Sequence, residues 1–225
     1  MGNIFINYDM GIPQIACTDC GKCGSLMGMS LCKIGNRGCC HYFPEFTLVD
    51  IQRMAVLEGG KKVLNLILET PGAAVNNYSI YVKGRFDKNA YERYISSGNT
   101  IDARNIKDHT IFFRTCPFVI PGAGCKLPVR FRTIVCNFFL CEEILERPGL
   151  EERFKPYIDE RSRYSRWYCR ENIILQHILT ENGLGLVSGF DASLSLLAGT
   201  GLSNYEFPAL EPVTYDSASP DNLPA

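Results

Sequence analysis

Cysteine is the residue type that gives this chain its clearest chemistry. Three cysteines, Cys17, Cys20 and Cys23, follow one another at intervals of three residues in the segment C-T-D-C-G-K-C. In a tight loop this spacing lets successive sulfur atoms converge on one centre, and Gly21 allows the backbone to turn between them. Thiolates bind zinc ions and iron–sulfur clusters. The segment therefore predicts a metal centre.

The same segment favours an iron–sulfur cluster, [4Fe–4S], over zinc. Bacterial ferredoxins use the run C-x2-C-x2-C-x3-C-P. This chain has the first three cysteines of that run, and Met27 stands in place of the fourth. A remote cysteine would have to complete the set, and Cys116, which precedes Pro117, is a candidate. Zinc remains the alternative, but structural zinc sites usually combine two C-x2-C pairs, and residues 116–141 contain no such pair.

The remaining cysteines form two groups and one isolated residue. Of the eleven cysteines in the chain, six lie in residues 17–40, four lie in residues 116–141, and Cys169 stands alone. Cys32 fits core packing as well as it fits metal binding, and for Cys169, which lies among aromatic residues, core packing is the simpler interpretation. The expected metal ligands are Cys17, Cys20, Cys23, Cys39, Cys40, Cys116, Cys125, Cys136 and Cys141.

Composition excludes several other classes of protein. The chain has 225 residues, of which 46% are hydrophobic and 21% charged, and its formal net charge is −1. It can bury a substantial core, but it has no global field that would attract nucleic acid or an anionic membrane. The odd and uneven set of cysteines argues against a disulfide scaffold. Residues 1–14 lack the basic and apolar parts of a signal peptide, and the chain has no long apolar run. We expect a cytoplasmic protein that binds neither membranes nor nucleic acid.

The pattern of residues predicts an α+β fold: a small cysteine-rich metal-binding domain with irregular N-terminal loops, a few short strands and packed helices. Residues 1–46 show little periodicity, as is typical of loops that a metal orders. Thr47 and Asp50 fit a variant of the capping box, which predicts a helix from Thr47. The other expected elements are helices over 61–69, 132–145 and 150–181, and strands over 78–82 and 110–114.

We expect one metal-binding domain over residues 1–182, in which the two cysteine groups converge. Residues 183–225, which are rich in Gly, Ser and Pro, are expected to form a C-terminal extension whose last dozen residues are disordered. The arginines in residues 161–170 share the predicted helix with acidic residues at positions 151, 152, 159, 160 and 171, which predicts a solvated, salt-bridged helix face rather than a surface for nucleic acid. His41, beside Cys40, is a weaker candidate for a mixed metal site.

Three pieces of the chain resemble the YkgJ family of zinc- or iron-chelating proteins, whose members carry a C-x2-C-x2-C-C cluster. The first piece is the cysteine triplet itself. The second, residues 38–51, has a cysteine pair, an aromatic-proline stretch and a helix that begins at a threonine. The third, residues 116–139, has a Cys-Pro-aromatic element, a single cysteine and then Cys136 followed by Asn-Phe-Phe. The resemblance implies metal chelation by the cysteines of these pieces.

The chain also departs from the family pattern. Gly24 stands where the doubled cysteine of the family would end the first motif, and Cys39 with Cys40 replaces that doublet after an insertion. The family's Tyr-x-x-Arg-Pro segment is absent, and residues 70–110 have no counterpart. The ligand set can therefore differ from that of the family, and a second metal centre is compatible with the sequence.

Three functions follow as hypotheses from this pattern. The first is a protein that holds a [4Fe–4S] cluster for redox, sensing or structural use. The second is a structural zinc protein that presents a surface to a protein partner. The third is a cluster-dependent modifying enzyme, because a related cysteine cluster occurs in flagellin lysine N-methylases; no methyl-donor site is evident in the sequence.

Overall fold

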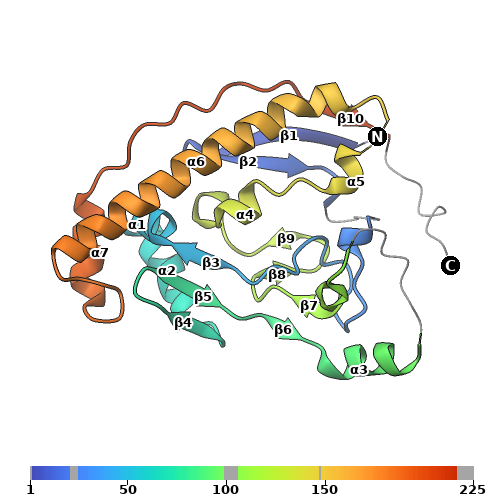
Figure 1. Cartoon of the computed structure of the whole chain (residues 1–225), viewed down its shortest axis with the longest axis horizontal. Helices are drawn as coiled ribbons and strands as arrows, with labels where there is room; N and C mark the ends of the chain where they lie inside the picture. Colours follow the sequence, from blue (N-terminus) through green and yellow to red (C-terminus); the bar gives the residue numbers. More distant parts are fainter. Residues whose placement is uncertain (1, 21–24, 99–105, 147, 217–225) are drawn as a thin grey trace.

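The structure is a computed structural model, and it describes residues 2–20, 25–98, 106–146 and 148–216. Helices and small antiparallel sheets occur together, which confirms the expected α+β class. The long helix α6 crosses one side of the molecule, above the sheet that contains β1 and β2, while the remaining small sheets lie on the opposite side (Figure 1).

The N-terminal segment is more regular than we expected, because it begins with a β-hairpin rather than a loop. Strands β1 (Gly2–Asp9) and β2 (Ile12–Cys17) pair in antiparallel register from Ile4 opposite Cys17 to Asp9 opposite Ile12. Met10 and Gly11 form the turn with φ values of 49° and 79°, as two-residue hairpin turns require. A third strand, β10 (Val213–Tyr215), pairs with the other edge of β1, so that residues 213–215 lie beside residues 2–4.

The central core forms where α1 (Leu48–Val56) packs against three other helices. Thr47 caps α1 through a complete capping box with Asp50, which confirms the predicted start of this helix. Helix α2 (Gly60–Leu68) follows, and β3 (Glu45–Thr47), β5 (Ser79–Val82) and β4 (Ala73–Val75) pair in that order beside it. The predicted strand over 78–82 is thus confirmed. The core side chains that are 0% exposed include Phe46, Val49, Ile51, Met54, Ile67, Ile80 and Val82.

Two predicted elements are wrong in kind or in length. The strand predicted over 110–114 is mostly a 3-10 helix, η3 (His109–Phe113), because the Asp108 carboxylate accepts hydrogen bonds from the Thr110 backbone and hydroxyl and so starts a turn. Only β7 (Arg114–Thr115), which pairs with β6 (Arg85–Phe86), is extended there. The remaining short elements are η2 (Leu26–Gly28), α3 (Lys88–Ser96), β8 (Val119–Ile120), β9 (Gly124–Cys125) and η4 (Val129–Phe131).

The helix predicted over 132–145 is interrupted. It consists of α4 (Ile134–Asn137), capped by the Thr133 hydroxyl at the Cys136 N–H, and α5 (Glu142–Leu145). Between them Phe138 leaves the helical conformation and stacks on Tyr164 of α6, with ring centroids 4.6 Å apart. Burial of this aromatic ring against α6 therefore outweighs continuation of the helix.

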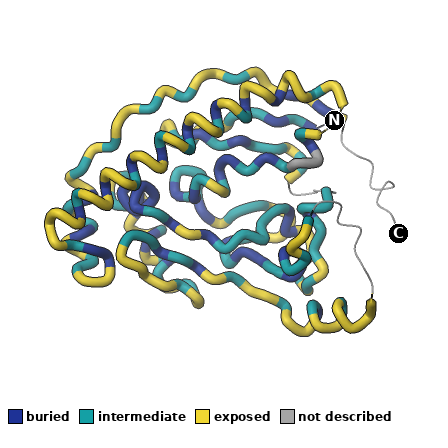
Figure 2. The backbone as a smooth tube through the Cα atoms, viewed as in Figure 1, coloured by how far each residue is buried: buried dark blue, intermediate teal, exposed yellow. Residues whose placement is uncertain are grey.

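The predicted long helix is confirmed as α6 (Glu151–Glu181). Buried and exposed residues alternate along it with helical spacing, and the buried face includes Tyr157, Tyr164, Tyr168 and Leu175 (Figure 2). The exposed Arg163 pairs at 3.3 Å with Glu160, which is buried, and His177 lies 3.4 Å from Glu181 on the exposed face of the helix. Among the helices of the described residues, none combines the length and the apolar character that a membrane span would need.

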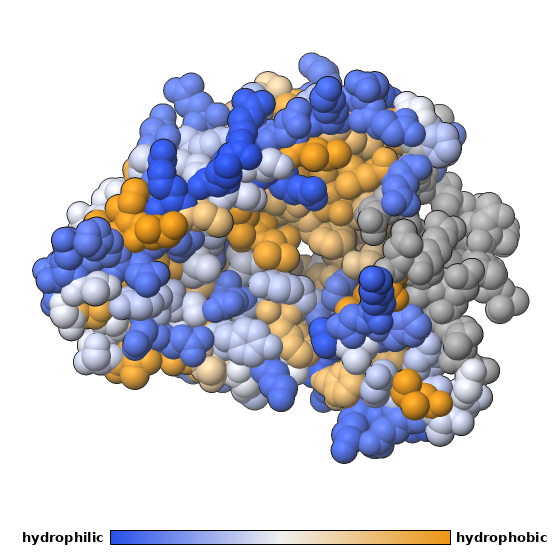
Figure 3. Space-filling model, in the orientation of Figure 1, coloured by the Kyte–Doolittle hydropathy of each residue, from blue (hydrophilic) through white to orange (hydrophobic). Residues whose placement is uncertain are grey.

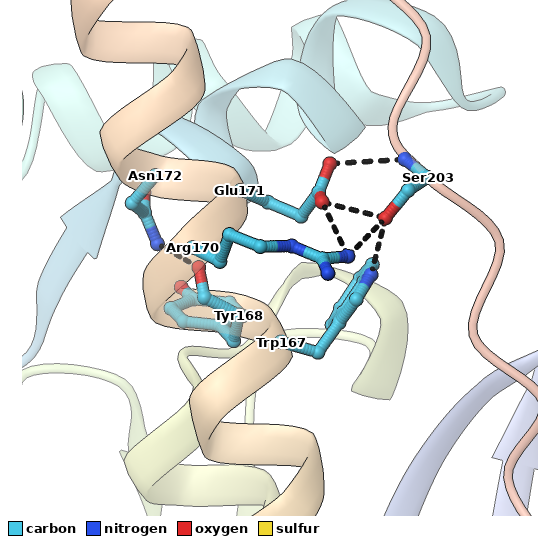
Figure 4. Close-up of polar contacts among 6 residues, drawn as sticks. All are labelled: Trp167, Tyr168, Arg170, Glu171, Asn172 and Ser203. Carbon is cyan, nitrogen blue, oxygen red and sulfur yellow. Dashed lines mark hydrogen bonds and ion pairs between the residues drawn. The ribbon is translucent and has the colours of Figure 1, made fainter.

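The chain after α6 folds back along the same helix. Helix α7 (Phe190–Gly199) packs against α1, and an extended segment then runs beside α6 toward β10. Ser203 anchors this segment: its N–H donates to Glu171 at 2.9 Å, and its hydroxyl oxygen accepts from Trp167 and Arg170, each at 2.9 Å (Figure 4). Residues 217–225, which include most of the expected disordered tail, lie outside the described residues.

Asp50 gives the fold a testable dependence on pH. Burial raises the pKa of its carboxyl to about 6, although Arg53 and hydrogen bonds from Tyr168 and Thr47 oppose the shift. Because the folded state then holds a proton that the unfolded state releases near pH 4, this carboxyl makes the protein less stable as the pH rises from about 4 to about 6. In urea unfolding, the stability of the native chain relative to Asp50→Asn should fall over this range by roughly 2–3 kcal/mol. A pH-independent difference between the two proteins would contradict this assignment.

Candidate metal centre

Three segments that are far apart in sequence bring their cysteines together. Cys20 follows β2, Cys39 and Cys40 lie in the turn before β3, and Cys116 follows β7. The backbone joins the last two directly, because the Cys116 N–H donates to the Cys40 carbonyl at 2.9 Å. The N-terminal and the central cysteines thus meet on one side of the fold.

The first part of the cluster is a chain of three thiols. Cys39 is hydrogen-bonded to both Cys20 and Cys40. Gly38 makes this approach possible: a side chain added there would place its Cβ 3.0 Å from the Cys20 carbonyl oxygen, and its φ of 56° suits glycine. The segment that carries Cys39 and Cys40 is therefore seated directly on the backbone of Cys20.

The second part of the cluster comes from residues 116–136. Cys116 is buried, and its sulfur accepts a hydrogen bond from the Phe118 N–H at 3.5 Å. Cys125 ends β9, which pairs with β8. Cys136 lies in α4, where the Thr133 hydroxyl donates to its sulfur at 3.3 Å. Each position is fixed by local hydrogen bonding, so the three thiols are held in place by short elements rather than by one helix.

The ionisation of these thiols shows that the two parts form one electrostatic unit. The pKa of Cys116 is raised to about 12, mainly by burial and in smaller part by the charges of Cys136, Cys40 and Cys125. The pKa of Cys136 is likewise raised to about 12, mainly by burial and in smaller part by the charges of Cys125 and Cys40. Cys40 is thus the thiol that the members of the second part share as a neighbour.

The thiols around Cys39 behave in the opposite way. The hydrogen bond from Cys39 lowers the pKa of Cys20 to about 7 and also lowers the pKa of Cys40. Arg132 adds to both effects. Hydrogen bonds to Cys20 and Cys40 raise the pKa of Cys39 itself. The cluster therefore combines thiols that ionise readily with thiols that burial keeps protonated.

A buried arginine that the sequence did not single out lies against this cluster. Arg37 is only 2% exposed, and its guanidinium donates to the carbonyl oxygens of Gly38 at 2.6 Å, Met29 at 2.7 Å and Ile111 at 3.0 Å. No carboxylate among the described residues pairs with it, and its Nε has no acceptor there. Burial lowers its pKa, and the charges that oppose this shift belong to Cys32, Cys40 and Cys39.

Arg132 is the second cation of the site. Its Nε donates to the Leu127 carbonyl at 2.8 Å, and its charge acts on four thiols, Cys20, Cys40, Cys125 and Cys136. In the sequence nothing distinguishes Arg132 from the other arginines. For Arg37 the one signal is its position two residues before the cysteine pair.

The other expected ligands take different positions. Cys17 ends β2 with its sulfur 3.0 Å from the Tyr215 hydroxyl, and it interacts electrostatically with Cys20. Cys141 precedes α5 and packs against the main core. Cys23 lies outside the described residues.

Cys32, Cys169 and His41, whose roles the sequence left open, are all placed by the structure. The Cys32 sulfur lies 3.2 Å from the Thr115 hydroxyl. Burial acts to raise the pKa of Cys32, but hydrogen bonds with Ser30 and Thr115, with a smaller effect of Arg37, lower it overall. Cys169 is exposed on α6, so the expectation that it packs in the core is wrong. Burial lowers the pKa of His41 to about 4, and its Nδ1 lies 3.5 Å from Arg37. His41 is therefore a neutral neighbour of the thiols.

The described cysteines are all free thiols. Among the described residues, no three His, Cys, Asp or Glu side chains are arranged to hold a metal ion as they stand. Cys39 is instead hydrogen-bonded to Cys20 and Cys40, as protonated thiols are, while Cys116 and Cys136 accept hydrogen bonds from Phe118 and Thr133. Metal binding to this cluster would require loss of those protons and a closer approach of the sulfurs.

An apolar groove lies beside α4, the helix that carries Cys136. Its volume is 560 Å³, and it lies between Val135, Phe138 and Phe139 on one side and Arg161 and Ser162 of α6 on the other. The space-filling view shows apolar side chains gathered in this region below α6 (Figure 3).

No protein-family model, curated protein or solved structure matches the chain.

Proposed function

We propose that this chain is a metal-binding protein that holds an iron–sulfur cluster, [4Fe–4S] in the favoured form, through cysteine thiolates for redox, sensing or structural use. The proposed ligands come from Cys20, Cys39, Cys40, Cys116, Cys125 and Cys136, with Cys17 and Cys23 adjoining them in sequence. A bound cluster would supply one-electron chemistry or a cross-link between the segments that carry these residues.

The observation that carries the proposal is the buried guanidinium of Arg37. A buried charge costs several kcal/mol unless an opposite charge lies nearby. The groups near Arg37 that can become anionic are thiols, Cys32, Cys39 and Cys40. A centre ligated by several thiolates carries net negative charge, so it would supply the counter-charge that Arg37 lacks among the described residues.

The donor set supports the same conclusion. Six thiols from separate segments share one region, and all of the described cysteines are free. Metal ligation is the main use of such grouped thiols in a reducing compartment. The motifs that resemble the YkgJ family contain the same cysteines. We therefore propose a relationship to that family together with the metal-binding function.

Anaerobic purification followed by analysis of iron, zinc and sulfide tests the proposal. We expect a brown protein with stoichiometric iron and acid-labile sulfide, and with broad visible absorption that dithionite bleaches. A colourless protein with stoichiometric zinc would instead support the zinc alternative and reject the iron–sulfur assignment. A protein that binds neither metal after anaerobic reconstitution would contradict metal binding altogether.

A further inference from the structure

A pocket of 670 Å³ includes Cys116 of the thiol cluster in its lining. Strands β6 and β7, which contribute to the lining, lie away from α6 (Figure 1). The pocket lies between the β5–β6 connection and the segment around β7 and β8, and the buried Cys116 forms part of its wall. Its volume falls within the range of sites that bind small molecules. The metal proposal assigns no role to this pocket.

The charged residues that line the pocket are all positive. Its lining includes the cations Lys83 and Arg85 and, among the described residues, no Asp or Glu. Both cations are exposed, and neither has an ion-pair partner within the described part of the chain. Two unpaired positive charges in one concave site attract anions.

The backbone fixes these two cations on the same side of the chain. Gly84 lies between them, and a Cβ added to it would come within 2.3 Å of the Thr115 carbonyl oxygen and 2.5 Å of the Phe43 ring. That side of the extended chain is therefore closed by protein. Because successive side chains of an extended segment point to opposite sides, Lys83 and Arg85 share the open side.

We propose that this pocket binds a small organic dianion, through carboxylate or phosphate oxygens held by Lys83 and Arg85. Their Cα atoms are separated by about 6.6 Å, the rise of two extended residues, so two anionic oxygens of one small ligand can each meet a cation. Arg binds carboxylate and phosphate with paired N–H donors, and Lys adds a point charge. The remaining wall is largely apolar and suits the carbon skeleton of the ligand.

The inference does not depend on the proposed metal centre. The cations and the pocket belong to elements whose positions are set by strand pairing, including β5 with β3 and β6 with β7. The pocket can therefore be tested on the full-length protein with or without bound metal. Failure of metal binding would leave this test intact.

Titration by calorimetry with succinate and with glycerol 3-phosphate tests the pocket, with succinamide and glycerol as neutral counterparts. We expect saturable binding of at least one dianion, none of the neutral compounds, and weaker binding as salt is added. Each of Lys83→Gln and Arg85→Gln should weaken binding by about fivefold. Tighter binding of succinate would identify a carboxylate ligand, and tighter binding of glycerol 3-phosphate would identify a phosphate ligand.

Two exposed cations on α6 provide matched controls for these variants. Lys155→Gln and Arg166→Gln remove the same charges from positions outside the pocket lining, so they should leave dianion affinity within about twofold of the native value. Absence of saturable binding for both dianions would overturn the inference. Equal weakening by the pocket variants and the α6 variants would also overturn it, since binding would then follow net charge alone.

Discussion

Replacing Cys40 with serine is expected to remove most of the bound metal. Cys40 is hydrogen-bonded to Cys39, and its charge acts on Cys116, Cys125 and Cys136, so it is the thiol that joins both parts of the cluster. A serine hydroxyl at this position does not ionise at neutral pH and is a poor ligand for zinc or iron. Metal analysis of Cys40→Ser, purified anaerobically beside the native chain, measures the loss directly.

The same variant should also lose stability, because metal binding and folding of the ligand-bearing segments are coupled. For a domain of this size each kcal/mol lost lowers the midpoint of thermal unfolding by about 2–4 °C. Cys169→Ser is the matched control. Cys169 is exposed on α6, so this variant makes the same exchange of sulfur for oxygen at a position outside the cluster. If Cys40→Ser keeps the native metal content, or if both variants lose metal equally, the proposed centre is wrong.

The sequence predicted those parts of the fold whose signals are local. The capping box at Thr47, the alternation in residues 79–82 and the apolar stripe of α6 each lie within one element, and the structure has each of them. The failures arise where a distant contact decides the outcome. The helix over 132–145 is interrupted because Phe138 stacks on Tyr164. No residue near Phe138 in the sequence indicates this contact.

The candidate site shows the same division. Cysteine spacing singled out nine thiols, because grouped cysteines are visible in any sequence, and the structure places six of them near one another. The cations escaped notice because a charged side chain is ordinarily solvated, and only tertiary structure reveals that Arg37 is buried among carbonyl oxygens and thiols. The hairpin of β1 and β2 was overlooked for another reason: the Met10–Gly11 turn is a weaker signal than the Asn-Gly and Asp-Gly pairs that usually mark such turns.

Replacing Arg37 with methionine is the change that most directly tests why this cation is buried. Methionine replaces only the linear stem of the arginine side chain, and it removes the charge and the hydrogen bonds to Gly38, Met29 and Ile111. A negatively charged metal–thiolate centre would then lose its buried counter-charge. Removal of one partner of a buried ion pair lowers the free energy of unfolding by about 3–5 kcal/mol. We expect metal affinity to fall by at least about tenfold, with a larger loss of stability in the metal-loaded protein than in the metal-free protein.

If the centre is an iron–sulfur cluster, Arg37→Met should also shift its reduction potential to a more negative value, because loss of a nearby positive charge disfavours the added electron. Arg37→Lys keeps the charge and should recover part of the metal affinity, although it cannot reproduce the planar arrangement of donors. Arg53→Met is a suitable control, since Arg53 is also buried but donates to Tyr164 at the α1–α6 interface. Loss of metal in Arg53→Met to the same degree would show that general destabilisation, and not the missing counter-charge, accounts for the effect. An Arg37→Met protein that loses stability equally with and without metal would separate Arg37 from the metal centre and remove the principal support for a thiolate cluster there.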